Sequence, residues 1–185
     1  MYFYLQKLYK IYNFIAVGYY KEASKMTKML KPTSLIILVV FDMIFKKIHV
    51  FRIKPGSRLV ESLKDYCEKN SINSAIFIGI IGSLKEIELA YLKELPGKYI
   101  KKTFHGPLEL VSSQGTVARV VSSSKEAAGE RWLHIHVVAS DEKSTVSGHL
   151  SEAIIFTTAE VVLGEVSDQI ERCHDEYTGL KELVK

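Results

Sequence analysis

Cysteine is scarce in this chain of 185 residues, which has only Cys67 and Cys173 and no CxxC spacing. A small secreted fold held by disulfides needs a denser cysteine pattern, so this usage predicts a reducing, cytoplasmic environment, while a bond between the two residues stays open. The sequence also lacks a P-loop, a dinucleotide-binding fingerprint and a Ser-His-Asp order. The commonest nucleotide-binding and hydrolase patterns are therefore excluded.

Long hydrophobic runs are missing as well. The longest uncharged apolar run covers residues 35–41 and is closed by Asp42, whereas a membrane-spanning helix needs about 20 residues. The run begins too late for a signal peptide and has no small-x-small cleavage pattern. We therefore predict neither a membrane span nor a leader. Leu5, Leu8 and Tyr12 recur at helical spacing, so a helix lying on a membrane or on the domain stays open.

A net excess of positive charge is absent from the body of the chain. Residues 1–42 contain six lysines against Glu22 and Asp42, whereas residues 43–185 hold 19 basic and 19 acidic residues. We expect an N-terminal extension over 1–42 and one domain over 43–185. Either the extension is part of the protein, or Met43 is the true start and the extension is not translated. A balanced body does not predict a basic footprint for duplex DNA.

The body begins with a clear strand and helix. Residues 44–53 mix apolar and polar side chains at period two, which predicts a strand that Pro55-Gly56 ends. Ser57 is then placed as an N-cap, and apolar residues follow at i, i+4 and i+7 through Lys69, which predicts the main helix. Asn70 is the expected C-cap.

The rest of the body predicts strands. The run "SAIFIGIIGS" indicates a buried strand interrupted by glycines, and "LKEIELAYL" indicates its hairpin neighbour. From Pro107 onward short strands with tight connections follow, which favours antiparallel pairing. The last residues, "DEYTGLKELVK", predict a short C-terminal helix. The expected fold class is α+β, a curved and mainly antiparallel β-sheet flanked by the main helix and this short one.

Three of the six histidines lie in the window "RWLHIHVVASDEKSTVSGHL". Alternation along a strand places His134 and His136 on one face and Leu133, Ile135 and Val137 on the other, the core face. A reversal centred between residues 142 and 143 pairs His136 with His149, and His134 then lies on the diagonal at roughly 7 Å. A bulge at Gly148 would shift this register.

Three converging imidazoles predict a metal site with a fourth position for water or a carboxylate. The metal ligands are therefore predicted to be His134, His136 and His149, with zinc as the ion. Glu152 and Glu160 are the candidates for a fourth or supporting ligand. His105 and His174 are expected to be a loop and a tail residue. The alternative to a metal site is that these histidines are ordinary residues on a solvent-exposed face of the sheet.

A cupin motif is a competing interpretation of the same window. "GERWLHIHVVASDEKSTVSG" combines a glycine, H-x-H, an acid and a second glycine. The spacing from Gly129 to His134 is one residue short of the cupin pattern, and the second half of that motif is missing.

Six segments, in order, resemble the PPC (plant and prokaryote conserved) domain, which plant AT-hook DNA-binding proteins also carry. They lie between Phe51 and Lys185 and are "FRIKPGSRLVESLKDYCEKNSI", "IFIGIIGSL", "HGPLELVSSQGTV", "RWLHIHVVASDE", "SGHLSEAIIFTTAEVVLGE" and "DEYTGLKEL". The resemblance implies a stand-alone prokaryotic-type domain that forms a homotrimer and holds a metal through the H-x-H and G-H-L histidines. The R-G-R-P core of an AT-hook is absent from the sequence.

Two functions follow as expectations. The first is a non-enzymatic, homotrimeric, zinc-binding PPC protein that is associated with DNA or DNA-bound proteins, or is regulatory, with the helix at 57–69 and the apolar strands as candidate trimer surfaces. The second is a zinc-dependent hydrolase or hydratase, in which a three-histidine zinc lowers the pKa of bound water. That enzyme would need a general base, for which Glu152 and Glu160 are the candidates.

Overall fold

The computed structural model of the protein describes residues 44–121 and 129–184, so the predicted extension over 1–42 lies outside the described residues. In chain order the elements are β1 (Phe45–Ile53), α2 (Leu59–Lys69), β2 (Ala75–Glu94), β3 (Lys98–Val120), β4 (Arg131–Ser140), β5 (Thr145–Val166), β6 (Glu171–His174) and β7 (Lys181–Leu183). Within these ranges no helix is long and apolar enough to cross a bilayer.

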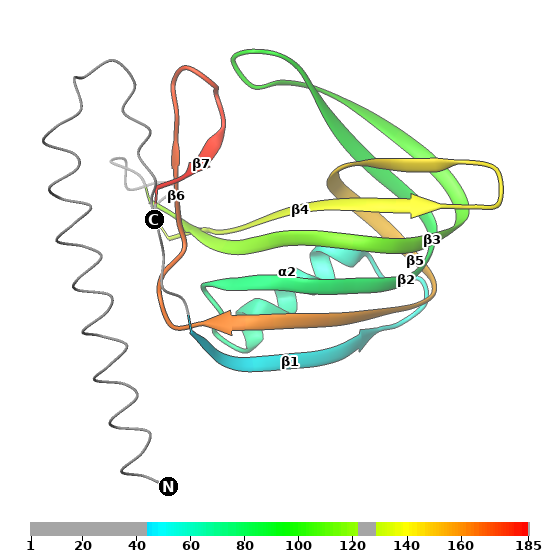
Figure 1. Ribbon diagram of the computed structural model, residues 1–185, viewed down its shortest axis with the longest axis horizontal. Helices are drawn as coiled ribbons and strands as arrows, with labels where there is room; N and C mark the ends of the chain where they lie inside the picture. Colours follow the sequence, from blue (N-terminus) through cyan, green and yellow to red (C-terminus); the bar gives the residue numbers. More distant parts are fainter. Residues whose placement is uncertain (1–43, 122–128, 185) are drawn as a thin grey trace, which may run out of the picture. The chain divides into compact units, whose positions relative to one another are not determined.

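All seven strands belong to one sheet in the order β1-β5-β2-β3-β6-β7, and β4 pairs with both β3 and β5. Every pairing is antiparallel except the short one between β3 and β6. Because β2 and β4 each pair with the same two strands, these four strands close on one another. Figure 1 shows the resulting strong curvature of the long strands, which confirms the predicted curved α+β fold.

The helix α2 closes the core of this curved sheet. Leu59, Leu63 and Cys67 are fully buried at spacings of four residues and join the main apolar cluster, so the predicted apolar stripe of the helix is used within the subunit. Burial raises the pKa of the Cys67 thiol to about 11. Cys173 is partly exposed, and the two cysteines form no disulfide.

The start of the helix differs from the prediction. Arg58, not Ser57, occupies the N-cap, with an extended backbone and no side-chain capping bond. The carbonyl of Ser57 instead accepts the N–H of Ile155 at 3.0 Å, so this residue is held to strand β5. The predicted C-cap at Asn70 is confirmed.

The predicted hairpin within residues 75–94 is wrong, because this stretch is the single strand β2. Both of its halves pair with β3 and with β5, so no reversal is needed to satisfy their backbone groups. Gly82 permits the continuous strand, since it has a φ of +151° and a Cβ there would collide with the carbonyl oxygen of Thr158. The polar alternation in the second half marks one exposed face of the same strand.

The predicted C-terminal helix is also wrong, because the segment forms β6, a turn and β7. Asp175 accepts the N–H of Thr178 at 2.7 Å, and the Gly179 N–H donates to the carbonyl of Asp175 at 2.8 Å. Gly179 has a φ of +69°, which favours glycine and ends any helical turn. A segment this short gains more from pairing Arg172 with Leu183 across the two strands than from an isolated helix.

Candidate functional site

The site is built on the hairpin formed by β4 and β5. His136 pairs with His149, and the pairing continues without a bulge to Ser140 and Thr145 at the turn. This confirms the predicted register. Asp141 fixes the turn by accepting the N–H groups of Lys143 and Ser144 at 2.8 and 2.7 Å. These hydrogen bonds lower the pKa of the Asp141 carboxyl below its ordinary value.

The two faces of β4 divide as the alternation predicts. Ile135 and Val137 are buried in the core, whereas His136 is exposed and His134 is half-buried. On the outer face, Thr116 and Gln114 of β3 lie beside the two histidines. The histidines therefore stand on a polar surface whose other side is a packed apolar core.

The three imidazoles meet on this outer face. One nitrogen from each of His134, His136 and His149 lies within 4.8 Å of the other two. The Nε2 atoms of His134 and His136 are 3.1 Å apart, and the ring centroids are separated by 5.0 to 5.4 Å. The predicted convergence is thus present, while metal binding by these residues remains a prediction.

The donor set fits a tetrahedral zinc ion. Zinc–nitrogen bonds of about 2.0 Å place two ligand nitrogens about 3.3 Å apart, close to the observed His134–His136 separation. Small side-chain rotations would bring the third nitrogen to the same distance. A three-histidine set leaves one position of the tetrahedron for water or another ligand.

The electrostatics of the cluster favour neutral imidazoles. Burial lowers the pKa of His134 to about 4, with further lowering by Arg172, His149 and His136. Burial, His136 and Arg172 also lower the pKa of His149. At neutral pH these rings therefore offer lone pairs, which is the form that binds a metal ion.

Arg172, in β6, is a site residue that the sequence analysis did not identify. Its side chain donates to the Nδ1 of His134 at 3.0 Å, to the Thr116 hydroxyl at 3.3 Å and to the carbonyl of Lys181 at 2.8 Å. A guanidinium only donates, so the Nδ1 of His134 accepts and its Nε2–H points to His136. The pairing of β6 with β3 and β7 places Arg172 here, and no sequence motif signals it.

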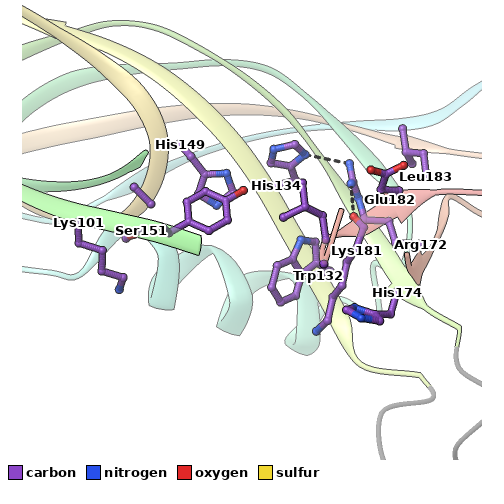
Figure 2. A pocket seen from close by; sticks show the side chains of 14 residues that line it. Lys101, Trp132, His134, His149, Ser151, Arg172, His174, Lys181, Glu182 and Leu183 are labelled. Atoms are coloured by element: carbon purple, nitrogen blue, oxygen red, sulfur yellow. Dashed lines mark hydrogen bonds between the residues drawn. The ribbon is translucent and has the colours of Figure 1, made fainter. Parts of the chain in front are cut away.

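Beside the cluster lies a cavity of about 760 Å³. His134 and His149 line it from β4 and β5, and Arg172, His174 and Lys181 line it from β6 and β7 (Figure 2). His174 is the last residue of β6 and not the tail residue that was predicted. The C-terminal strands thus form part of the wall.

The two carboxylates proposed as further ligands lie outside the cluster. Glu152 instead contacts the start of α2. Its Oε1 accepts the N–H of Val60 at 2.7 Å, and its Oε2 is 3.4 Å from the Nε of Arg58. Glu160 is exposed and pairs with Arg52 of β1. Neither carboxylate therefore joins the three histidines, because Glu152 contacts the start of α2 and Glu160 lies beside β1.

His105 is likewise placed differently from the prediction. It lies within β3, where it pairs with Glu86, and is not in a loop. Its Nδ1 is 3.1 Å from the Glu86 carboxylate, and its side chain is exposed. It contributes to neither the cluster nor the cavity.

A sequence model of the Plants and Prokaryotes Conserved (PCC) domain matches residues 44–167. A metal-containing protein from Archaeoglobus fulgidus is 28% identical, with a TM-score of 0.70 over 80% of this chain and 100% of that one. A plant- and prokaryote-conserved (PPC) protein from Pyrococcus horikoshii is 30% identical, with a TM-score of 0.68 over 80% of this chain and 99% of that one.

A third solved protein, from Bacteroides thetaiotaomicron, is provisionally named as DNA-binding. It is 25% identical, with a TM-score of 0.64 over 76% of this chain and 96% of that one. No curated protein matches the chain. Together with the family match, these structures confirm the resemblance to the PPC domain.

Replacing Glu152 by glutamine tests its role at the helix. The change removes a charged acceptor from the first turn of α2, so we expect a loss of about 1 kcal/mol in the free energy of unfolding and no change in zinc content. Urea denaturation and metal analysis measure the two effects, with exposed Glu160→Gln as the matched control. A folded Glu152→Gln protein that loses zinc would contradict the assignment.

Proposed function

The chain belongs to the Plants and Prokaryotes Conserved domain family, and from this premise we propose that it is a non-enzymatic metal-binding protein that holds zinc through His134, His136 and His149. The observation that carries the proposal is the approach of one nitrogen from each ring to within 4.8 Å of the others. The relative from Archaeoglobus fulgidus is a metal-containing protein, which supports the same conclusion.

A zinc-dependent hydrolase or hydratase is the alternative, and it needs a general base near the metal-bound water. Glu152 is occupied by the amide of Val60 and the guanidinium of Arg58. Glu160 is exposed and stands outside the cluster. Because neither predicted base reaches the histidines, we assign binding and not catalysis to the site.

The metal site is tested by removing one ligand at a time. We expect one zinc ion per chain in the purified protein and a loss of affinity of at least about 100-fold in His136→Ala, because two imidazoles hold zinc far more weakly than three. Calorimetric titration and elemental analysis measure both. His105→Ala is the control, since this exposed histidine lies outside the cluster. Stoichiometric zinc in a His134→Ala/His136→Ala protein would refute the site.

We also propose that the protein assembles through an apolar face of its sheet, as the homotrimer that the family resemblance implies. Four large apolar side chains of β1 and β2 are between 46% and 73% exposed, namely Ile48, Val50, Ile78 and Ile81. Val50 pairs with Val162, which pairs in turn with Gly79, so β1 and β2 present these side chains on either side of β5. A soluble monomer rarely leaves such a patch exposed.

Placing a charge in this patch tests assembly. Val50→Lys would bury an ammonium group opposite the apolar Val162 at the interface, so we expect the trimer to dissociate into monomers. Light scattering after size-exclusion chromatography measures the mass. Ile100→Lys is the matched control, because Ile100 is also exposed but belongs to β3. A wild-type protein that is monomeric at all concentrations would contradict the proposal.

Association with DNA is proposed to depend on the lysines of residues 1–42. These residues carry the net positive charge of the chain, whereas residues 43–185 are balanced. The provisional name of the Bacteroides thetaiotaomicron relative concerns DNA binding, and phosphate contacts by clustered lysines supply salt-dependent affinity.

Lysine-to-glutamine substitutions separate the two parts of the chain. Removing three lysines of the first segment should reduce the slope of log K against log salt by roughly 2 to 3 for duplex DNA, because each phosphate contact contributes about 0.9. The variants are Lys21/Lys25/Lys28→Gln and, as control, Lys46/Lys47/Lys54→Gln, whose lysines are exposed in the body. A wild-type protein without DNA affinity would contradict the proposal.

A further inference from the structure

The cavity beside the histidine cluster has the size of a ligand-binding site. Its volume of about 760 Å³ falls within the roughly 300–1,000 Å³ of small-molecule pockets. Two of the clustered histidines, His134 and His149, form part of its wall. A molecule in the cavity would therefore lie directly beside the proposed metal position.

The lining is predominantly cationic. Lys101, Arg172 and Lys181 contribute three positive charges, and Glu182 contributes one negative charge. The ammonium groups of the two lysines also contact carboxylates outside the cavity, at 2.8 Å for Lys101–Glu88 and 3.1 Å for Lys181–Glu130. Such partly exposed pairs are weak and can be exchanged for another anion.

Arg172 is the residue that indicates a missing partner. Its side chain is buried, with a residue exposure of 6%, and its Nε has no hydrogen-bond partner among the described residues. No carboxylate of residues 44–121 and 129–184 forms an ion pair with it. A buried guanidinium with a free donor is costly unless a ligand or water satisfies it. A carboxylate can pair with the donors that remain after the contacts to Lys181, Thr116 and His134.

The remaining wall suits a flat apolar body. Trp132 and Tyr99 both line the cavity. The Trp132 ring is covered by the ammonium group of Lys181, whose Nζ lies 3.8 Å from the ring centroid. The Tyr99 ring lies 6.1 Å from that of His149. Aromatic walls with a few convergent polar groups are typical of sites for small organic molecules.

We propose that this cavity binds a small organic carboxylate, whose carboxylate group pairs with Arg172 beside the histidine cluster and whose apolar body lies along Trp132 and Tyr99. The inference rests on the proposed metal site for a second contact to the carboxylate. Arg172 provides the first contact, and its approach to 3.0 Å from the Nδ1 of His134 places the anion within reach of the cluster.

Matched probes test the proposal on the full chain without any mutation. Calorimetric titrations of the zinc-loaded and the metal-free protein use 2-naphthoate, its neutral analogue 2-naphthamide, and inorganic phosphate. We expect 2-naphthoate to bind at least about tenfold more tightly than the amide, because a charge-assisted pair replaces a neutral contact. Phosphate binding without preference for 2-naphthoate, equal affinity for acid and amide, or no binding would overturn the carboxylate assignment.

Arg172→Gln should weaken 2-naphthoate binding at least about tenfold, while zinc affinity stays equal or rises because a positive charge beside the ion is removed. Lys98→Gln, outside the cavity and 65% exposed in its side chain, is the control and should bind like the wild type. Unchanged 2-naphthoate affinity in a folded Arg172→Gln protein would refute the inference.

Two measurements keep failure of this inference distinct from failure of the metal site. A wild-type protein that holds zinc but does not prefer the carboxylate contradicts only the inference, whereas a wild-type protein without zinc contradicts the proposed function. If the Arg172→Gln protein fails to fold, the Lys181→Gln protein tests the inference in its place. The partly exposed side chain of Lys181 also lines the cavity. The Lys181→Gln substitution should weaken 2-naphthoate binding several-fold, and an unchanged affinity counts against the inference.

Discussion

The antiparallel register between β4 and β5 determines the rest of the site. Pairing of His136 with His149 brings their two imidazole centroids to 5.4 Å, and the two-residue period of β4 adds His134 on the same side. A shift of one residue would turn the histidines into the core and expose Ile135 and Val137. Burial of these two side chains therefore secures the register that gathers the imidazoles.

The C-terminal strand β6 places the guanidinium of Arg172 beside the same histidines. Arg172 reaches His134 because β6 runs parallel to β3, and its hydrogen bond leaves the Nδ1 of His134 without a proton. A zinc ion at Nε2 requires the opposite tautomer, in which Nδ1 carries the proton. Zinc and the Arg172 contact therefore compete, and an anionic ligand that engages the guanidinium would relieve this competition.

The sequence predicts those parts of the site that depend on local pairing. The β4–β5 hairpin follows from alternation and a polar turn, and the stripe of α2 follows from helical spacing, so both are confirmed. The role of Glu152 and the position of Arg172 depend on contacts with residues far away in the sequence, Val60 and Thr116. The C-terminal helix was predicted wrongly because a short polar segment has no strong period of its own, and pairing within the folded protein decides its conformation.

X-ray absorption at the zinc edge of the zinc-loaded protein tests the central claim most directly, because it counts the ligands and identifies their type. The account predicts three imidazole nitrogens and one oxygen at about 2.0 Å, with no sulfur. A spectrum with sulfur at about 2.3 Å, or with oxygen ligands alone, would contradict a zinc site built from His134, His136 and His149.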